Sequence, residues 1–288
     1  MKIAVIGANG QLGSDVVDAF RASGDEVAAL THLDLELQDL NSVSGCLQRV
    51  APEVIVNTAA MHNVDLCEKE PEKAFAVNGM GSRHLATVVH DMGATIMHVS
   101  TDYVFDGTKR SPYVESDAPS PLNVYGNTKL SGEHFVRSTA EKHFVLRTSA
   151  IYGHHPCRAK GGLNFIELML KLAKERGKVR VVDSEFVTPT STSELARQIV
   201  ALSRSADYGL YHATAEGSCS WHEFAAEVFA MTGTKVDLQV AGPNEFPAKV
   251  PRPKYSVLEN NRLKHHGLNV FRDWRCGVRD YLNSAPRV

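Results

Sequence analysis

A tyrosine and a lysine four residues apart, Tyr125 and Lys129, are the side chains in this sequence best suited to move a proton. On a helix the two lie one above the other on the same face. A lysine ammonium beside a phenol favours the phenolate, so we expect Lys129 to lower the pKa of Tyr125 from its ordinary value of about 10. Such a tyrosine can serve as a general acid near neutral pH. The spacing alone is weak, because two residues on a solvated helix face also match it.

A second chemical group, Ser100-Thr101-Asp102, follows the apolar run Ile96–Val99. That run predicts a buried strand of a parallel sheet, which would deliver the group to the carboxyl edge where ligands bind. A hydroxyl at the strand end and the Tyr125 helix could then converge on one carbonyl. The proline-containing loop between them would form part of the substrate mouth.

The N-terminal region predicts the first unit of a dinucleotide-binding fold. The β-branched run Ile3–Ile6 leads into a turn containing Gly7, Gly10 and Gly13, and a helical pattern follows. In such a unit one glycine makes the turn, one lets backbone approach a pyrophosphate, and one lets the helix pack on the strand. The pyrophosphate would lie at the helix N-terminus, where free N–H groups and the dipole favour an anion.

The second predicted strand, Val27–Leu30, leaves the choice of nicotinamide cofactor open. It ends at Leu30-Thr31-His32, and acidic residues come only later, at Asp34 and Glu36. No carboxylate at the strand end repels a 2′-phosphate, so NADPH is permitted. Alternatively Asp34 or Glu36 reaches the ribose, as an acidic residue does in NADH enzymes.

Further strands and helices alternate along the chain. Asp39 or Asn41 caps a helix that runs to Val50, and the strand Val54–Val56 ends in small residues that leave room for a ligand. Helical periodicity continues from about residue 71 to residue 92. After Arg147, predicted elements are helices 165–176 and 193–204, a strand 179–182, and a Ser220/Glu223 capping box before a helix that ends at Gly233.

This order of elements predicts an α/β protein: a Rossmann-type doubly wound parallel sheet with a smaller C-terminal α/β substrate lobe. We place the dinucleotide-binding domain at residues 1–150 and the substrate lobe at residues 151–288. The chain is expected to cross between the two, so the boundary is nominal.

Composition excludes several classes of function. The chain has 288 residues, a formal charge of −2 and a pI near 6.7, which gives no reason to expect nucleic acid as a partner. No apolar stretch is long enough for a membrane helix. Five cysteines without a C-x-x-C motif favour reduced thiols and a cytoplasmic location. His154-His155-Pro156-Cys157 lacks the spacing of common zinc motifs, and we expect a loop there and no metal.

Longer motifs resemble the dTDP-4-dehydrorhamnose reductase family of the extended short-chain dehydrogenase/reductase superfamily, over nearly the whole chain. They are G-A-N-G-Q-L-G at 7–13, V-N-T-A-A at 56–60, V-D-L-C-E at 64–68, S-T-D-Y-V-F-D-G at 100–107, P-L-N-V-Y-G-N-T-K-L-S-G-E at 121–133, R-T-S at 147–149, N-F at 164–165, P-T at 189–190 and R-P-K-Y-S-V-L at 252–258. The pair S-T-D-Y-V-F and P-L-N-V-Y-G-x-[ST]-K is the most specific, whereas the glycine motif alone is not.

The resemblance implies NAD(P)H-dependent reduction of a nucleotide-linked 4-keto-6-deoxy sugar, with NADPH or NADH as cofactor. Tyr125 would donate the proton to the 4-keto oxygen, Thr101 would hydrogen-bond that oxygen, and Lys129 would hold the nicotinamide ribose. The implied cofactor-binding residues are Gly10, Gln11 and Leu12 at the pyrophosphate with Gly7 and Gly13 of the same turn, Asp39 and Leu40 at the adenosine end, Ala59, Ala60 and Met61 at the middle of the cofactor, and in addition Val99 and Lys129.

On the substrate side the resemblance implies contacts from Thr101, Asp102, Asn164 and Arg252. An arginine there could clamp a diphosphate with two parallel hydrogen bonds, or it could be a surface residue held between two prolines. A homodimer is a further expectation, without a membrane or nucleic-acid partner.

The sequence departs from the family pattern on the substrate side. Ala150 stands where a tryptophan is common after R-T-S, and Met61-His62 stands where an aromatic residue or histidine is often followed by threonine. Glu185 and Val187 replace a glutamine and a glycine. These changes leave the sugar less certain than the reaction.

Two other functions stay open. A sugar-nucleotide epimerase or dehydratase uses the same Tyr/Lys pair with tightly bound NAD, although dehydratases tend to carry an Asp-Glu pair after the threonine and here Tyr103 follows Asp102. A non-catalytic, cofactor-binding regulatory subunit would also keep the motifs.

Overall fold

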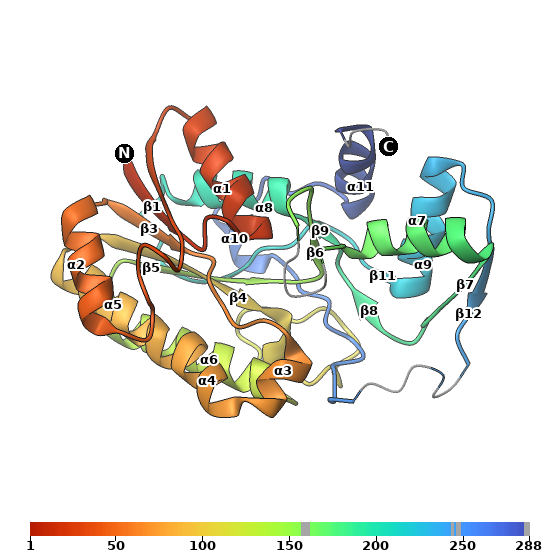
Figure 1. The fold of residues 1–288 in the computed structure, drawn as a ribbon, viewed down its shortest axis with the longest axis horizontal. Coiled ribbons are helices and arrows are strands. Elements are labelled where there is room, and N and C mark those ends of the chain that lie inside the picture. The colour runs from red at the N-terminus through yellow and green to blue at the C-terminus, as the bar shows by residue number, and fades with distance from the viewer. Residues whose placement is uncertain (157–161, 243–244, 246–248, 285–288) are drawn as a thin grey trace.

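A six-stranded parallel sheet forms the centre of the protein (Figure 1). The structure is a computed structural model and describes residues 1–156, 162–242, 245 and 249–284. The strand order of the sheet is β10-β5-β4-β3-β1-β2, and every neighbouring pair is parallel. The strands are β1 (Lys2–Ile6), β2 (Glu26–Leu30), β3 (Val54–Asn57), β4 (Thr95–Thr101), β5 (His143–Thr148) and β10 (Gly209–His212).

Helices cover both faces of this sheet, as the apolar strands require (Figure 1). On one face α1 (Gln11–Ala22) and α8 (Thr192–Leu202) pack together, with Phe20 and Ile199 in the core. On the other face lie α2 (Leu40–Val50), α5 (Gly81–Asp91) and α6 (Val124–Thr139), with Leu47 and Val136 inside. The predicted doubly wound α/β class is confirmed.

The sheet reverses its strand order between β1 and β3. In open α/β sheets, ligands bind at the carboxyl ends of the two strands that flank such a point. Here the glycine turn after Ile6 and the small residues after Asn57 lie on that edge. The topology therefore brings the two segments that the sequence singled out for the cofactor together at one edge of the sheet.

The C-terminal lobe, at the opposite end of the molecule from α2 (Figure 1), is built from helices and short two-stranded sheets. Its elements are β6 (Ile151–Tyr152), α7 (Phe165–Arg176), β7 (Lys178–Val181), β8 (Phe186–Val187), β9 (Thr190–Ser191), β11 (Cys219–Ser220), α9 (Trp221–Thr232), β12 (Asp237–Val240) and α11 (Trp274–Ser284). Phe224 and Trp274 pack edge to face in its core. The predicted helix 165–176 and the Ser220/Glu223 capping box are confirmed.

The domain boundary at residue 150 stays a prediction. Strand β10 and helix α8 lie beyond residue 150, yet both belong to the central sheet and its covering layer. A short helix near the sheet, α10 (Asn261–His265), adds Leu263 to the same core. The chain thus returns from the lobe to the sheet.

The helix predicted over residues 71–92 is interrupted. It consists of α4 (Pro71–Phe75), a π-helical segment η1 (Ala76–Met80) and α5. The sequence also gave no prediction for α3 (Val64–Lys69). A π segment inserts an extra residue into a turn, which apolar periodicity does not reveal.

The described cysteines Cys46, Cys67, Cys219 and Cys276 are free thiols, and Cys157 lies outside the described residues. Within the part of the chain that the structure describes, every helix is too short or too polar to span a bilayer.

Candidate active site

The glycine turn after β1 is held against the next loop along the sheet edge. Gly7 has a φ of +79°, and a Cβ there would lie 2.9 Å from the backbone nitrogen of Ala59. At Gly13 a Cβ would lie 2.1 Å from the carbonyl oxygen of Gly7. Gly7 therefore allows the turn itself, and Gly13 allows helix α1 to press against it.

The N-terminus of α1 is suited to a pyrophosphate. Gly10 is the N-cap, it offers no side chain to the first N–H groups, and the first turn carries no acidic residue. The described residues leave the position of a Gly10 Cβ uncrowded except by the Gly7 carbonyl oxygen at 3.2 Å. Free N–H groups at the positive end of a twelve-residue helix are what a diphosphate needs.

Acidic side chains near the predicted binding place of the cofactor's adenosine are held by hydrogen bonds within their own loops. Asp34 accepts hydrogen bonds from the backbone nitrogen and the hydroxyl of Thr31, at 2.7 and 2.9 Å, and these bonds lower the Asp34 pKa. Asp39 caps α2 through Asn41, and Leu40 is exposed beside it. Asp34 is bonded to Thr31 and Glu36 accepts hydrogen bonds from Gln38, so in the described structure neither of these two carboxylates stands free at the end of β2, and the choice between NADPH and NADH stays a prediction.

Tyr125 and Thr101 meet, as the sequence predicted from their positions. The Thr101 side chain lies close enough to the phenol to oppose the rise in the Tyr125 pKa, and the Tyr103 ring packs edge-on against Tyr125 at 5.8 Å between centroids. Thr101 in turn donates to Asp102 Oδ1 at 3.0 Å. This cluster at the end of β4 places one phenol and one hydroxyl where a single carbonyl oxygen could contact both.

Asp102 lies deeper than we expected. It is 4% exposed, and its carboxylate accepts from Thr101, from Ser149 Oγ at 2.9 Å, and from Ser256. Burial raises its pKa although these hydroxyls oppose that rise. The structure thus makes Asp102 a support for Thr101, and its contact with a sugar stays a prediction.

Lys129 is directed at β4, and the prediction that it lowers the pKa of Tyr125 is wrong for this structure. Its Nζ donates to the carbonyl oxygen of Val99 at 2.7 Å and lies 3.4 Å from His98 Nε2. Burial lowers the Lys129 pKa to about 8 and raises that of Tyr125. Loss of water around each group outweighs the attraction between an ammonium and a phenolate.

Close backbone approach holds α6 in position. A Cβ on Gly126 would lie 2.3 Å from the carbonyl oxygen of Tyr103, and one on Gly132 would lie 2.4 Å from that of Asn78. Asn123 caps the helix by accepting from the Gly126 nitrogen at 2.9 Å. Gly126 therefore lets α6 contact the backbone just after β4, and Gly132 lets it contact the π segment η1.

A buried ion pair joins α6 to the sheet. Arg147 donates three hydrogen bonds to the Glu133 carboxylate, from Nε to Oε1 at 3.0 Å and to Oε2 at 3.2 Å and from Nη2 to Oε2 at 2.7 Å, and the Glu133 and Arg147 side chains are 0% and 2% exposed. Ser100, next to Thr101, donates to Glu133 Oε1 at 2.5 Å. Charge-assisted bonds of this kind fix geometry well in a dry interior.

Sequence reasoning missed Asn57, Asn78 and His98. Asn78 lies in the π segment, where it accepts from the Met61 nitrogen at 2.9 Å and donates to Thr128 on α6 at 3.0 Å. Asn57 and His98 face each other from β3 and β4 at 3.2 Å. A polar residue within an apolar run was the available signal for all three, because buried polar groups are hydrogen-bonded.

The predicted substrate residues fall into two groups. Arg252 is 40% exposed in its side chain and lies close enough to Tyr103 to oppose the rise in the pKa of that phenol, and the Tyr103 ring in turn packs against Tyr125. Asn164 instead caps α7, and its amide also donates to the Gly153 carbonyl and to Tyr281. Its role towards a substrate stays a prediction. Ala150, where the family pattern has tryptophan, adopts a left-handed φ of +43°.

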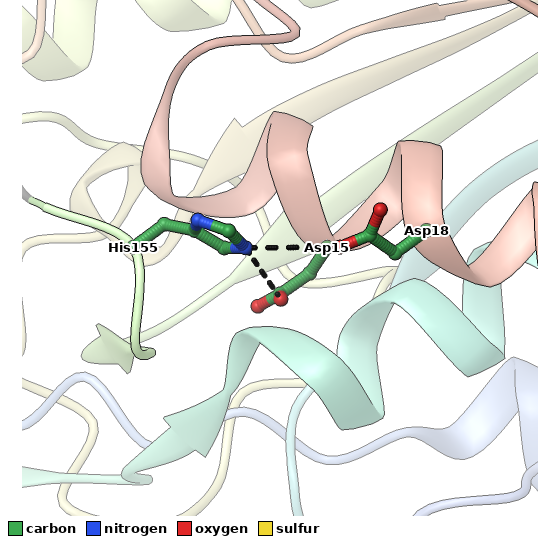
Figure 2. Close-up of side chains that lie close together, drawn as sticks. All are labelled: Asp15, Asp18 and His155. Atoms are coloured by element: carbon green, nitrogen blue, oxygen red, sulfur yellow. Dashed lines mark ion pairs between the residues drawn. The ribbon is translucent and has the colours of Figure 1, made fainter. Parts of the chain in front are cut away.

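Asp15, Asp18 and His155 gather beside the α1 N-terminal half (Figure 2). His155 Nε2 lies 3.5 Å from Asp15 and 3.8 Å from Asp18, and the potential ligand atoms all lie within 4.8 Å of one another. The predicted loop at His154–His155 is confirmed. The cluster has the composition of a cation site, and the expectation of no metal stays untested.

The parallel sheet with its glycine turn, together with Tyr125, Lys129 and Thr101 at the strand edge, defines a nucleotide-dependent oxidoreductase of the short-chain dehydrogenase/reductase type. More narrowly, the chain belongs to the family described as the RmlD substrate binding domain, whose model matches residues 1–286.

Individual relatives agree with this assignment. The chain is 39% identical to the spore coat polysaccharide biosynthesis protein SpsK of Bacillus subtilis, over 98% of this chain and 96% of that protein. It is also 39% identical to the dTDP-4-keto-6-deoxy-D-glucose reductase of Streptomyces niveus, over 95% and 94%. The crystal structure of dTDP-4-dehydrorhamnose reductase from Bacillus anthracis in complex with NADP superposes with a TM-score of 0.93 at 33% identity, covering 99% of each chain.

Proposed function

We propose that this protein is an NADPH-dependent reductase of a dTDP-linked 4-keto-6-deoxy sugar, of the dTDP-4-dehydrorhamnose reductase type. The observation that carries the proposal is the proximity of the Thr101 side chain to the Tyr125 phenol at the end of β4, on the sheet edge that also carries the glycine turn and the free α1 N-terminus. The names of the Streptomyces niveus and Bacillus anthracis reductases, both of matching length, support the substrate class, and the Bacillus anthracis structure contains NADP.

The cofactor fits the residues present. The α1 N-terminus and the uncrowded Gly10 would hold the pyrophosphate, and Lys129, which donates to the Val99 carbonyl oxygen at the end of β4, would hold the nicotinamide ribose. When bound, NADPH supplies the hydride that reduces the carbonyl carbon of the sugar to an alcohol carbon. Asp34 is bonded to Thr31 and does not stand free at the strand end, which is compatible with a 2′-phosphate.

The protein's own residues deliver the proton. Tyr125 Oη, beside Thr101, donates its hydrogen to the carbonyl oxygen as that oxygen gains negative charge, and the resulting phenolate regains a proton from solvent. The Thr101 hydroxyl can rotate from Asp102 to donate to the same oxygen. The raised pKa of Tyr125 keeps it protonated until a substrate accepts that hydrogen.

Arg252 is positioned to recognise the diphosphate of the substrate. It reaches Tyr103 at the mouth, keeps 40% of its side chain exposed, and lies 4.0 Å from Asp65, its nearest ion-pair partner. An arginine that is only loosely paired can exchange a distant carboxylate for a bidentate phosphate contact.

The experiment is turnover of purified protein with NADPH and either dTDP-4-dehydrorhamnose or dTDP-4-keto-6-deoxy-glucose. We expect the absorbance of reduced nicotinamide to fall with one of the two sugars and the product to be the 4-hydroxy sugar. No decrease with either sugar would contradict the proposed substrate class. Turnover without net NADPH use, by protein that retains NAD through purification, would instead support the epimerase or dehydratase alternative.

We further propose that the protein acts in the cytoplasm and forms a homodimer. The free thiols of the four described cysteines fit a reducing compartment. Light scattering of the purified chain, which has a monomer mass of 31.5 kDa, would test the dimer: a single species at about that mass would contradict it.

A further inference from the structure

Lys129 is joined to two buried polar side chains, Asn57 and His98, that the proposed reaction does not use. Asn57 at the end of β3, His98 on β4 and Lys129 on α6 are 1%, 1% and 2% exposed. Asn57 Nδ2 lies 3.2 Å from His98 Nδ1, and His98 Nε2 lies 3.4 Å from Lys129 Nζ. Both ring nitrogens of His98 are thus committed to one neighbour each.

The backbone fixes the direction of every hydrogen bond in this chain. Asn57 Oδ1 accepts the backbone N–H of Ala59 at 3.1 Å, so the other end of the amide, the NH₂ group, faces His98. The amide therefore donates to His98 Nδ1, which must be the unprotonated nitrogen. A neutral imidazole then carries its hydrogen on Nε2, the nitrogen that faces Lys129.

An N–H directed at Lys129 Nζ suits an amine and opposes an ammonium. The amine can donate one hydrogen to Val99 O at 2.7 Å and accept the His98 N–H on its lone pair. An ammonium has three hydrogens and no lone pair, so it would oppose hydrogen to hydrogen at Nε2. Buried donors that face each other without an acceptor are costly.

We propose that Asn57 and His98 are positioning residues for Lys129: Asn57 holds the His98 ring with its hydrogen on Nε2, and this N–H fixes Lys129 Nζ and favours its uncharged form. The inference rests on the proposed function for its catalytic meaning, because Lys129 is the residue that would bind the nicotinamide ribose. The hydrogen-bond directions themselves follow from the fold alone.

The charges around Lys129 agree with this proposal. The titratable groups in this region come from every element packed around Lys129. They are Tyr125 and Glu133 on α6, His98 on β4, Asp102 directly after β4, Arg147 on β5, and Cys67 on α3 near the phenol. Among the described residues Glu133 raises the Lys129 pKa, but Glu133 is already paired with Arg147. Burial prevails and lowers the Lys129 pKa to about 8, while His98 stays neutral because its own pKa is lowered well below the usual value.

The first test reads the His98 tautomer by ¹⁵N NMR of histidine-labelled full-length protein at about pH 9, above the Lys129 pKa of about 8, where the amine prevails. We expect the hydrogen on Nε2 in the wild type. In Asn57→Asp the carboxylate can still accept from Ala59, but it must also accept from His98, so the hydrogen should move to Nδ1. A wild-type ring with its hydrogen on Nδ1, or an unchanged tautomer in Asn57→Asp, would overturn the proposal.

The second test follows the ¹³Cε signal of Lys129 against pH, assigned by its loss in Lys129→Met. We expect a wild-type midpoint of about 8. In His98→Gln the amide oxygen can accept from an ammonium, so the midpoint should rise by at least about one unit, a tenfold tighter hold on the proton. The matched control is His212→Gln, another buried histidine, whose Nδ1 faces the Tyr113 and Glu259 carbonyls and no lysine.

The control should leave the Lys129 midpoint unchanged. Equal midpoints in wild type and His98→Gln, or equal shifts in both variants, would show that His98 is merely a packing residue. If His98→Gln does not fold, Asn57→Asp provides the same comparison through the tautomer. Neither readout needs turnover, so an inactive wild type would count against the proposed function and not against this inference.

Discussion

Replacing Arg147 by methionine is the perturbation whose effect the structure defines most sharply. Glu133 would stay fully buried, with Ser100 as its remaining side-chain donor, and would keep its charge without a counter-ion. Removing one partner of a buried pair costs about 3–5 kcal/mol because the other charge is left in a medium that solvates it poorly. Arg147 also covers the Phe105 ring at 5.1 Å, but methionine retains much of that apolar contact.

The expected change in melting temperature follows from the size of the chain. At about 2.1 cal/mol/K per residue, 288 residues unfold with an entropy of about 0.6 kcal/mol/K. A loss of 3–5 kcal/mol therefore lowers Tm by about 5–8 °C. Calorimetry and urea unfolding of Arg147→Met measure the two quantities independently.

A second variant separates the charge effect from lost packing. In the double variant Glu133→Leu/Arg147→Met neither charge of this pair remains, so most of the stability should return. Arg180→Met, which breaks a partly exposed pair with Glu245 at 3.0 Å, is the matched control and should cost only about 0–1 kcal/mol. A double variant as unstable as the sum of its single changes would refute the reasoning.

Three further predictions concern the same helix and its neighbours. Gly126→Ala should lower kcat/KM on the order of 100-fold in a steady-state assay, because the new Cβ would lie 2.3 Å from the Tyr103 carbonyl oxygen and must displace the helix. The control is Gly45→Ala, where a Cβ would have nothing within 4 Å, so the free energy of unfolding should be unchanged or slightly higher. Lys129→Met should be more stable than wild type by on the order of 3 kcal/mol below pH 8, because there the folded wild type buries a charged lysine. Above the lowered pKa of about 8 the lysine is uncharged in the folded state and still protonated in the unfolded state, so this advantage should shrink as the pH rises. A pH-independent difference in the free energy of unfolding in urea would contradict this prediction. Asn78→Ala removes a side chain that hydrogen-bonds to two segments and should lower the free energy of unfolding by about 1–3 kcal/mol, so an unchanged urea midpoint would count against its bridging role.

Much of the fold follows from local patterns in the sequence. The β-branched run Ile3–Ile6, the glycines after it and the capping residues Asp39 and Ser220 each specify their element within a few neighbouring positions. The π segment does not, because it depends on how closely α6 approaches at Gly132, more than 50 residues further on.

The site was predictable in its members but not in its electrostatics. Tyr125, Thr101 and Lys129 could be brought together from strand order and helix spacing. The Lys129 charge depends on His98, from a different element, and on the water that the packed sheet excludes, neither of which a four-residue spacing reveals. Asp102 likewise reads as a sugar contact until Ser149 and Ser256 are seen to surround it.

The central claim, that Tyr125 delivers the proton to a sugar carbonyl, is tested most directly by Tyr125→Phe. The change removes one oxygen from a ring that still packs against Tyr103, so folding and NADPH affinity should be unchanged in melting and titration experiments. The account predicts that kcat for NADPH oxidation with the dTDP-linked 4-keto sugar falls by about 10²–10⁴-fold. A folded Tyr125→Phe protein that binds NADPH and reduces the sugar at the wild-type rate would contradict it.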